Sequence, residues 1–571
     1  MEDAMVGRRT FIRTSVIMGT GLFLDWRGVR AETPKGSPGA TAQTAAGKVR
    51  GLQIDKVQAF RGIPYGASTA GARRFQPPAK PEPWTGVRDA FELGLRSPLI
   101  DSVLVPEWDP LNRREPMGED CLNLNVWTPG VAAARRPVMV WLHGGGYAAG
   151  SPGMVAYDGA NLARTHDVVV VGVTHRLNAF GFLYLAELGG ERFAEASNAG
   201  MRDIIAGLEW VRDNIANFGG DPGNVTIFGQ SGGAGKVSTL LGMPAAQGLF
   251  HRAVAQSGSA VTSMPAGAAT QSAEAFMSRL GLKGNQVDEL QKLPMEQLLG
   301  ALQPRNSGAA AATGAPEGAR GGPSTGSGRA GGRGGGGGFA ASPVVDGKSL
   351  PHDVFNPAAS TLSANIPLLI GSTETEVTWN VNTDYTPPSD EAALRERVKR
   401  TLRTDDAQAG SVVSLYRKGR PMASHLDLAL IIETDASNFR SGTDTQAERK
   451  AALGKAPVYM YRFQWYSPVG GGRLRAMHCM DIPFVFENVD LCKTVVGDGK
   501  DRYALADKMS SAWVAFARTG NPNHKGLPKW DPFTADRRAT MIFNNECRAV
   551  TDPYREERLA VAAAQPARQT Q

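Results

Sequence analysis

Short apolar runs alternate with helical patterns through most of this chain. Runs of four to six mostly apolar residues end at turn-forming or polar residues, as expected for strands buried on both faces of a sheet. They occupy residues 138–142, 168–173, 225–228, 367–370 and 458–463, with a shorter run at 253–255. Each is too short for a buried helix, and the first two are rich in valine.

Between two of these runs the period changes to that of a helix. From Asn198 to Phe218, apolar side chains recur every three or four residues, with Asn198 placed to cap the start and Gly219 to end it. A second helix is predicted over Ala504–Thr519, before Gly520. Strands that alternate with helices predict an α/β fold, with a large, mostly parallel sheet covered by helices on both faces.

The run at 225–228 leads directly into Gly229-Gln230-Ser231-Gly232-Gly233, and residues 236–241 can then form a helix. A serine at the apex of a strand–turn–helix is the context of the G-x-S-x-G nucleophile elbow, in which glycines allow strand and helix to approach closely. The alternative is a chance match, because the chain contains 68 glycines. We interpret Ser231 as a nucleophile, which needs a base, an acid and an oxyanion hole.

Candidates for all three partners lie elsewhere in the chain. His143 and three glycines follow the strand at 138–142, and such a run leaves backbone N–H groups free to stabilise an oxyanion. Glu374 and Glu376 follow the strand at 367–370, and His478 comes later, in the chain order expected for such enzymes. His143 and His175 are interpreted as packing or loop-orienting residues.

Three segments have the composition of something other than a folded core. Residues 1–31 combine Arg8-Arg9 with an apolar run that is too short to span a bilayer. This pattern predicts an export signal of the twin-arginine type, and therefore a periplasmic or secreted protein. The alternatives are a mitochondrial-type presequence and a frayed basic tail. Residues 32–46 are predicted to be a disordered linker, and the Gly-rich stretch at about 303–338 a disordered insertion. One catalytic domain then spans 47–560, followed by a flexible tail at 561–571.

Charge and cysteine content exclude several other classes of protein. The net charge is +7, but five of these charges lie in residues 1–31 and 303–338, so no basic stripe for nucleic acid remains. The four cysteines, Cys121, Cys479, Cys492 and Cys547, lack metal-site spacing and are too few for a disulfide scaffold of this size. Cys492 and Cys547 could pair in an oxidising compartment.

These motifs together resemble the type B carboxylesterases, the group that includes cholinesterases and bacterial carboxylesterases. The matching segments run in the family's order over roughly residues 48–545: 60–65, 119–125, 143–147, 198–200, 218–222, 229–233, 256–259, 371–376 and 478–486.

The resemblance implies an α/β-hydrolase fold in one large domain, with Ser231 as nucleophile, His478 as base and Glu376 as acid. Alternation alone does not choose between Glu374 and Glu376, and the family's spacing, with the acid five residues after Gly371, selects Glu376. The resemblance further implies an oxyanion hole of the Gly145, Gly146 and Gly232 amides, with Ser257 and Gln230 close behind the reacting groups. No metal or cofactor is implied.

The sequence departs from the family pattern at several positions. Gln230 stands where the family usually has glutamate, Gly232 where it has alanine, and Val377 where a glycine follows the acid. The uncharged Gln230 alters the field beside the serine and puts a preference for cationic substrates in doubt. Cys121 matches a family cysteine that is usually bonded, but Ser97 stands near the place of its partner, which predicts a free thiol.

The sequence thus predicts an exported serine hydrolase acting on small carboxylic esters through an acyl-enzyme, with no nucleic-acid partner and no stable membrane anchor. The alternatives are an amidase or carbamate hydrolase with the same triad, and a binding protein that keeps the fold without the chemistry. Acyl and alcohol preference, selectivity for ester over amide and oligomeric state stay open at this point.

Overall fold

The structure is a computed structural model that describes residues 36–101, 104–303, 339–381 and 386–565. The predicted export signal at 1–31 lies outside the described residues, and so does all of the predicted Gly-rich insertion except residue 303. The described residues belong to a single compact unit.

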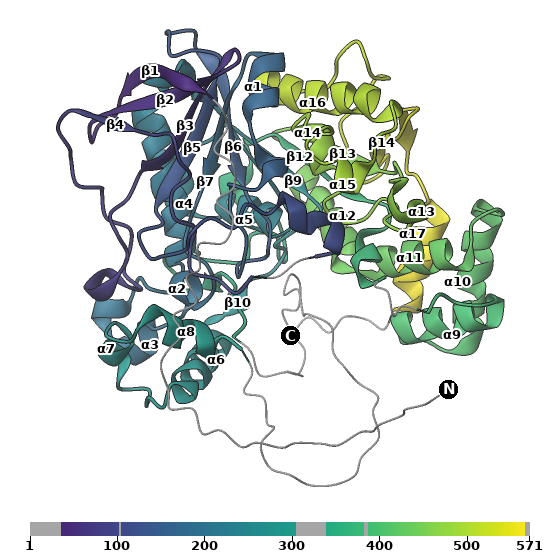
Figure 1. The fold of residues 1–571 in the computed structure, drawn as a ribbon. Coiled ribbons are helices and arrows are strands. Elements are labelled where there is room, and N and C mark those ends of the chain that lie inside the picture. The colour runs from purple at the N-terminus through teal and green to yellow at the C-terminus, as the bar shows by residue number, and fades with distance from the viewer. Residues whose placement is uncertain (1–35, 102–103, 304–338, 382–385, 566–571) are drawn as a thin grey trace, which may run out of the picture. The chain divides into compact units, whose positions relative to one another are not determined.

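A thirteen-stranded sheet runs through the described part of the chain (Figure 1), in the order β1-β2-β3-β5-β7-β6-β8-β9-β12-β13-β14-β15 with β4 beside β2, and β10 and β11 form a separate pair. The strands are β1 (Ser37–Gln43), β2 (Lys48–Ile54), β3 (Val57–Pro64), β4 (Val87–Asp89), β5 (Asn123–Thr128), β6 (Arg136–Leu142), β7 (Val169–Val173), β8 (Gly220–Gln230), β9 (Arg252–Gln256), β10 (Met264–Pro265), β11 (Val344–Val345), β12 (Leu368–Thr373), β13 (Val458–Phe463), β14 (Ala539–Phe543) and β15 (Arg548–Thr551).

The centre of the sheet is parallel, and its margins are antiparallel except for β4, which pairs parallel with β2. Every neighbouring pair from β7 through β6, β8, β9, β12 and β13 to β14 is parallel. The carboxyl ends of these strands therefore meet at one edge, where ligands bind in open α/β sheets. The predicted α/β fold with a large, mostly parallel sheet is confirmed.

Alternate residues of the central strands pack into two separate cores. Val138 and Val140 of β6 face one core, and Met139 and Trp141 face the other, as the two-residue period of a strand requires. Helices α4, α5 and α12 contribute side chains to the first core, and α1 and α16 to the second. Both faces of the central strands are therefore buried, which explains their continuous apolar runs.

Seventeen α-helical segments occur among the described residues, several of them single turns, besides eight short 3-10 helices. They are α1 (Ala160–His166), α2 (Asn178–Phe182), α3 (Ala186–Gly189), α4 (Ala199–Asn214), α5 (Gly232–Leu240), α6 (Ala266–Arg279), α7 (Val287–Leu290), α8 (Met295–Ala301), α9 (Glu391–Leu402), α10 (Asp406–Gly419), α11 (His425–Ala436), α12 (Asn438–Ala452), α13 (Val469–Gly472), α14 (Ile482–Val485), α15 (Lys493–Val496), α16 (Asp501–Thr519) and α17 (Arg555–Ala564). None of them is long and apolar enough to cross a membrane.

Two predicted boundaries are wrong. Residues Ser37–Gln43, expected in a disordered linker, form β1 and pair antiparallel with β2. Backbone hydrogen bonds to a neighbouring strand order this Ala- and Thr-containing segment, and composition does not reveal them. The tail expected from residue 561 instead continues α17 to Ala564, because Val561 is buried against other helices.

The structure also bears on two finer predictions, the cap of α4 and the state of the cysteines. Asn198 does precede α4, but its side chain makes no cap and bonds to the loop around Val344 and Ser349 instead. All four cysteines are free, including Cys492 and Cys547. Cys121 lies beside Ser97, as the family comparison of these two positions suggested, and burial raises the pKa of its thiol to about 12.

Candidate active site

Ser231 lies on a strained turn between β8 and α5. Its backbone angles are φ 58° and ψ −125°, a region that side-chain-bearing residues rarely occupy. Its amide donates to the carbonyl of Gln256 at the end of β9, at 2.8 Å. A Cβ added to Gly229 would lie 2.6 Å from the Gly233 carbonyl carbon, and one added to Gly233 would overlap the Leu142 oxygen. The glycines therefore permit the close approach that presents the serine.

The glycine loop after β6 borders this turn. A Cβ placed on Gly144 would lie 3.4 Å from Ser231 Cβ, and one placed on Gly232 would overlap the backbone of Gly146. Gly145 and Gly146 both have positive φ, at 90° and 63°. Among the described residues, neither of their amides donates a hydrogen bond, and Gly232 opens α5, where an amide has no partner within the helix. Free amides of three residues thus gather beside Ser231.

Glu376 and His478 form a close buried pair. Glu376 follows β12 and its Oε2 lies 2.6 Å from Nδ1 of His478. The other carboxylate oxygen accepts the amide of Thr373 at 2.7 Å. Because Nδ1 donates to a carboxylate, Nε2 of His478 carries the lone pair that can accept a proton.

Arg440 of α12 braces the loop that carries Glu376. Its guanidinium, which is buried, donates to the Thr373 carbonyl at 2.9 Å and to the Ser372 hydroxyl. Ser257, which the family resemblance placed behind the acid, is buried nearby, but its hydroxyl has no hydrogen-bond partner among the described residues. The acid loop is held by a guanidinium and a backbone amide, and no bond joins Ser257 to Glu376.

The side chain of Gln230 lies against the imidazole of His478. Its Nε2 is 3.4 Å from Nδ1 and 3.3 Å from Nε2 of the ring, within hydrogen-bonding reach of both nitrogens. Because Nδ1 donates to Glu376, the amide can donate only to Nε2 of the ring. The thiol of Cys479 donates to Gln230 Oε1 at 3.1 Å and fixes the orientation of the amide. Within the described chain, Ser231 Oγ makes no hydrogen bond to His478, as is common before a substrate binds.

Burial and charge act in opposite directions on His478. Burial by itself lowers the pKa of the imidazole, but Cys479 and Glu376 outweigh it and raise that pKa well above its ordinary value. Two aromatic rings also pack on the imidazole, Trp379 at 4.8 Å and Phe439 at 4.7 Å between ring centres. The ring is thus held in place, and the carboxylate of Glu376 favours the imidazolium that forms when the neutral ring accepts a proton.

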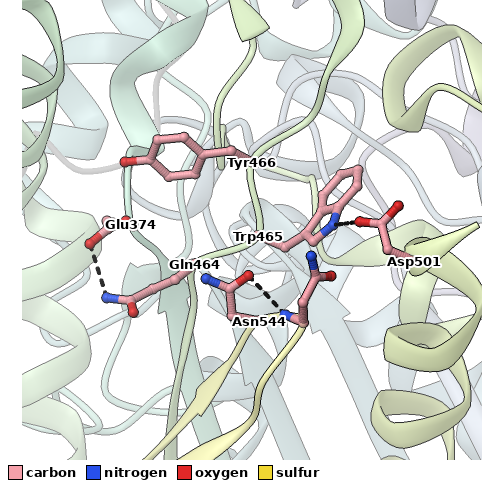
Figure 2. A pocket seen from close by; sticks show the side chains of 7 residues that line it. Glu374, Gln464, Trp465, Tyr466, Asp501 and Asn544 are labelled. Atoms are coloured by element: carbon pink, nitrogen blue, oxygen red, sulfur yellow. Dashed lines mark hydrogen bonds between the residues drawn. The ribbon is translucent and has the colours of Figure 1, made fainter. Parts of the chain in front are cut away.

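Glu374, the other candidate acid, points into a separate polar pocket (Figure 2). The pocket has a volume of about 400 Å³ and is lined by Glu374, Gln464, Trp465, Tyr466, Asp501, Asn544 and Asn545. Gln464 donates to Glu374 at 2.9 Å, and the Trp465 indole donates to Asp501 at 2.8 Å. Burial raises the pKa of Glu374, and Arg420 and Arg462 offset part of that effect.

The structure therefore brings Glu376 to His478 and the Gly145, Gly146 and Gly232 amides to Ser231. The sequence analysis missed the contributions of Arg440 and Cys479 to the site. In the sequence, Arg440 is only a charged residue in a helix, and Cys479 is only a thiol next to a histidine. The sequence analysis also passed over Lys236, although a lysine among glycine, alanine and valine in α5 is a visible anomaly.

Known proteins resemble this chain over most of its length. Residues 38–562 match the profile of the Carboxylesterase family. The para-nitrobenzyl esterase of Bacillus subtilis is 34% identical over 526 residues, which cover 90% of this chain and 97% of that protein.

Two solved structures share the fold. A carboxylesterase of Geobacillus stearothermophilus superposes with a TM-score of 0.72 at 34% identity, covering 91% of this chain and 99% of that one. An esterase from the anaerobe Clostridium hathewayi, which can hydrolyse aliphatic aromatic polyesters, has a TM-score of 0.76 at 33% identity, covering 92% and 98%.

Proposed function

Because the chain belongs to the carboxylesterase family and is a carboxylic ester hydrolase, we propose that Ser231, His478 and Glu376 form its catalytic triad. In this mechanism Ser231 Oγ attacks the ester carbonyl and Nε2 of His478 takes the hydroxyl proton. The alcohol leaves with that proton, and an acyl-enzyme remains on Ser231. Water then attacks the acyl group with His478 again as the base, which frees the acid and restores the serine.

Glu376 acts in this scheme through the imidazole. The contact of 2.6 Å to Nδ1 fixes the tautomer in which Nε2 faces the serine, and the carboxylate stabilises the imidazolium that forms. Ser231 must turn its hydroxyl towards Nε2 for the first step. The amide of Gln230 lies 3.3 Å from Nε2, so the serine hydroxyl must take the place of that amide at the nitrogen.

The amides of the three glycines stabilise the oxyanion in this mechanism. Charge develops on the carbonyl oxygen as the tetrahedral intermediate forms, and preorganised donors stabilise it there. Positive φ at Gly145 and Gly146 turns their peptides in a way that most residues resist. The proposal therefore assigns the oxyanion hole to the amides of Gly145, Gly146 and Gly232.

One observation carries the proposal, namely the buried Glu376–His478 pair beside a strained serine. The test is Ser231→Ala, which should lower kcat for p-nitrophenyl esters by about 10⁶ while the fold persists, since loss of a triad nucleophile has that effect. A variant that keeps more than a few per cent of its turnover would refute the assignment. A matched panel of p-nitrophenyl esters and p-nitroanilides on the wild type separates an esterase from an amidase.

We also propose that the protein is exported through the segment that contains Arg8-Arg9, on the sequence pattern alone. The test replaces both arginines with lysine and fractionates cells of a host with twin-arginine transport. Esterase activity should move to the cytoplasm. An unchanged distribution between fractions would rule out this route.

A further inference from the structure

Helix α5, which follows the nucleophile, also packs one of its faces against the glycine loop after β6. Gly232 touches the backbone of Gly146, and Gly235 approaches the hydroxyl of Tyr147, which a Cβ at that position would meet at 2.9 Å. Thr239 lies 3.4 Å from the same hydroxyl. These residues recur at helical spacing, so the loop lies along one side of the helix that follows Ser231.

Lys236 lies in the middle of this face and is fully buried. Its Nζ donates to the carbonyl oxygen of His143 at 2.9 Å, at the point where β6 ends and the glycine loop begins. The ammonium also lies 5.8 Å from the ring centre of Tyr147, at the other end of the same loop. One side chain thus contacts both ends of the segment that supplies the oxyanion amides.

No carboxylate pairs with Lys236 among the described residues. Burial alone lowers the pKa of its ammonium to about 7. Two neutral imidazoles lie close by, His143 and His175, stacked with ring centres 4.7 Å apart. Each has Nδ1 near a backbone carbonyl oxygen, and its Nε2 has no partner in the part of the chain that the structure describes. An ammonium buried without a counter-ion is costly, so its presence beside the active site calls for a role.

We propose that Lys236 is a positioning residue that fastens the His143–Tyr147 loop to helix α5 and so holds the oxyanion amides in register with Ser231. This inference rests on the proposed oxyanion hole. The bond to the His143 carbonyl fixes the orientation of the peptide that enters the glycine run. Glycine peptides are otherwise free to rotate, and donors must be prepositioned to stabilise an oxyanion.

The test compares Lys236→Met with Lys450→Met in the full chain. Methionine keeps most of the length and the apolar stem of lysine but cannot donate. Lys450 is the matched control because it is also fully buried, has a pKa lowered by burial to about 8, and donates to the backbone carbonyl of Ala364. Ala364 precedes the amino end of β12, away from the edge that carries the active site.

Lys236→Met should lower kcat for p-nitrophenyl butyrate by about 10- to 100-fold, the size expected when oxyanion donors are displaced, while KM changes less than about threefold. Affinity for a trifluoromethyl ketone, which forms a tetrahedral oxyanion on the serine, should fall by a similar factor. Amide exchange in residues 143–150 should become faster. Lys450→Met should leave kcat and the ketone affinity within about twofold.

Several results would overturn the inference. These are an unchanged kcat in Lys236→Met, an equal loss in Lys450→Met, and a fall in kcat without weaker ketone binding. If Lys236→Met does not fold, Lys236→Gln takes its place, because its amide is one bond too short to reach the His143 carbonyl. Failure of both variants to fold, with Lys450→Met folded, would assign Lys236 to the stability of the domain and overturn the narrower role.

The outcome can be distinguished from failure of the proposed mechanism. If Ser231→Ala keeps its activity, the oxyanion assignment fails together with this inference. If Ser231→Ala is inactive and Lys236→Met is normal, the mechanism stands and only the role of Lys236 is wrong.

Discussion

Glu374 and Glu376 lie two residues apart on the same loop, both buried, yet their surroundings have little in common. Glu376 contacts a single imidazole that two aromatic rings hold in place. Glu374 faces a polar pocket with amide and indole groups around it. Burial by itself therefore does not identify a catalytic carboxylate in this protein. The catalytic carboxylate is identified by its partner, the imidazole of His478, which comes from a segment about a hundred residues away in sequence.

Replacing each glutamate in turn with glutamine should give the largest difference in kcat between the two sites. Glu376→Gln should lower kcat by about 10⁴, the effect seen when the acid of such a triad loses its charge, because the imidazole is no longer held in the useful tautomer. Glu374→Gln should change kcat less than about twofold. Steady-state kinetics on one p-nitrophenyl ester measures both, and a crippled Glu374 variant with a normal Glu376 variant would reverse the assignment.

Arg440 contacts the end of β12, which both glutamates follow. The variant Arg440→Lys therefore tests whether this contact positions Glu376. Lysine cannot bond to the Ser372 hydroxyl and the Thr373 carbonyl together, as the guanidinium does. We expect kcat to fall by about tenfold through displacement of Glu376, in line with the effect of small misplacements on catalysis. The double variant Arg440→Lys/Glu376→Gln should be no slower than Glu376→Gln alone. An additive loss would mean that Arg440 acts elsewhere.

The pH dependence of kcat/KM tests the charge around Glu376. His478 must be neutral to act as a base, and its pKa is raised, so activity should increase with pH through that raised value. Glu376→Gln removes one cause of the shift and should move the rising limb to lower pH. Gln230→Glu adds a carboxylate beside the ring and should move it to higher pH. Profiles from about pH 5 to about pH 10 measure both shifts, and movement in the opposite direction would contradict this account.

The smallest effect is expected from Glu374 and concerns stability. Its folded pKa lies above its ordinary value of 4.5, so its contribution to folding is present at acidic pH and is lost as pH rises through the folded value. Glu374→Gln should remove this dependence. Urea unfolding of both proteins at pH 4 and pH 7 should therefore show that the wild type loses more stability than the variant between the two values. Parallel behaviour of the two proteins would show that Glu374 does not titrate in this range.

Sequence patterns predicted the parts of this protein that rest on local rules. Buried strands can be recognised in the sequence as continuous apolar runs, and the strand predicted at 458–463 matches β13 at both ends. Ser231 was found because glycines flank it at the positions where strand and helix nearly touch. Glu376 was selected over Glu374 by family spacing, since both lie on the same side of an extended chain.

The remaining features depend on contacts between distant segments. The bond from Arg440 to the Thr373 carbonyl joins the end of β12 to a helix 67 positions later, and the Cys479–Gln230 bond spans 249 positions. No pattern within a window of residues contains such information. β1 was missed for the same reason, because its order comes from its pairing with β2.

The bond from the Ser231 amide to the Gln256 carbonyl has a consequence for how the protein is made. The strained turn is braced by a residue that a ribosome adds 25 positions later, and His478 follows only after a further 222. If domains fold as their chain emerges, a nascent polypeptide carries its nucleophile long before it carries a base. On the proposed mechanism, the growing chain is therefore unable to cleave esters, and synthesis itself delays activity until almost the whole domain has been translated.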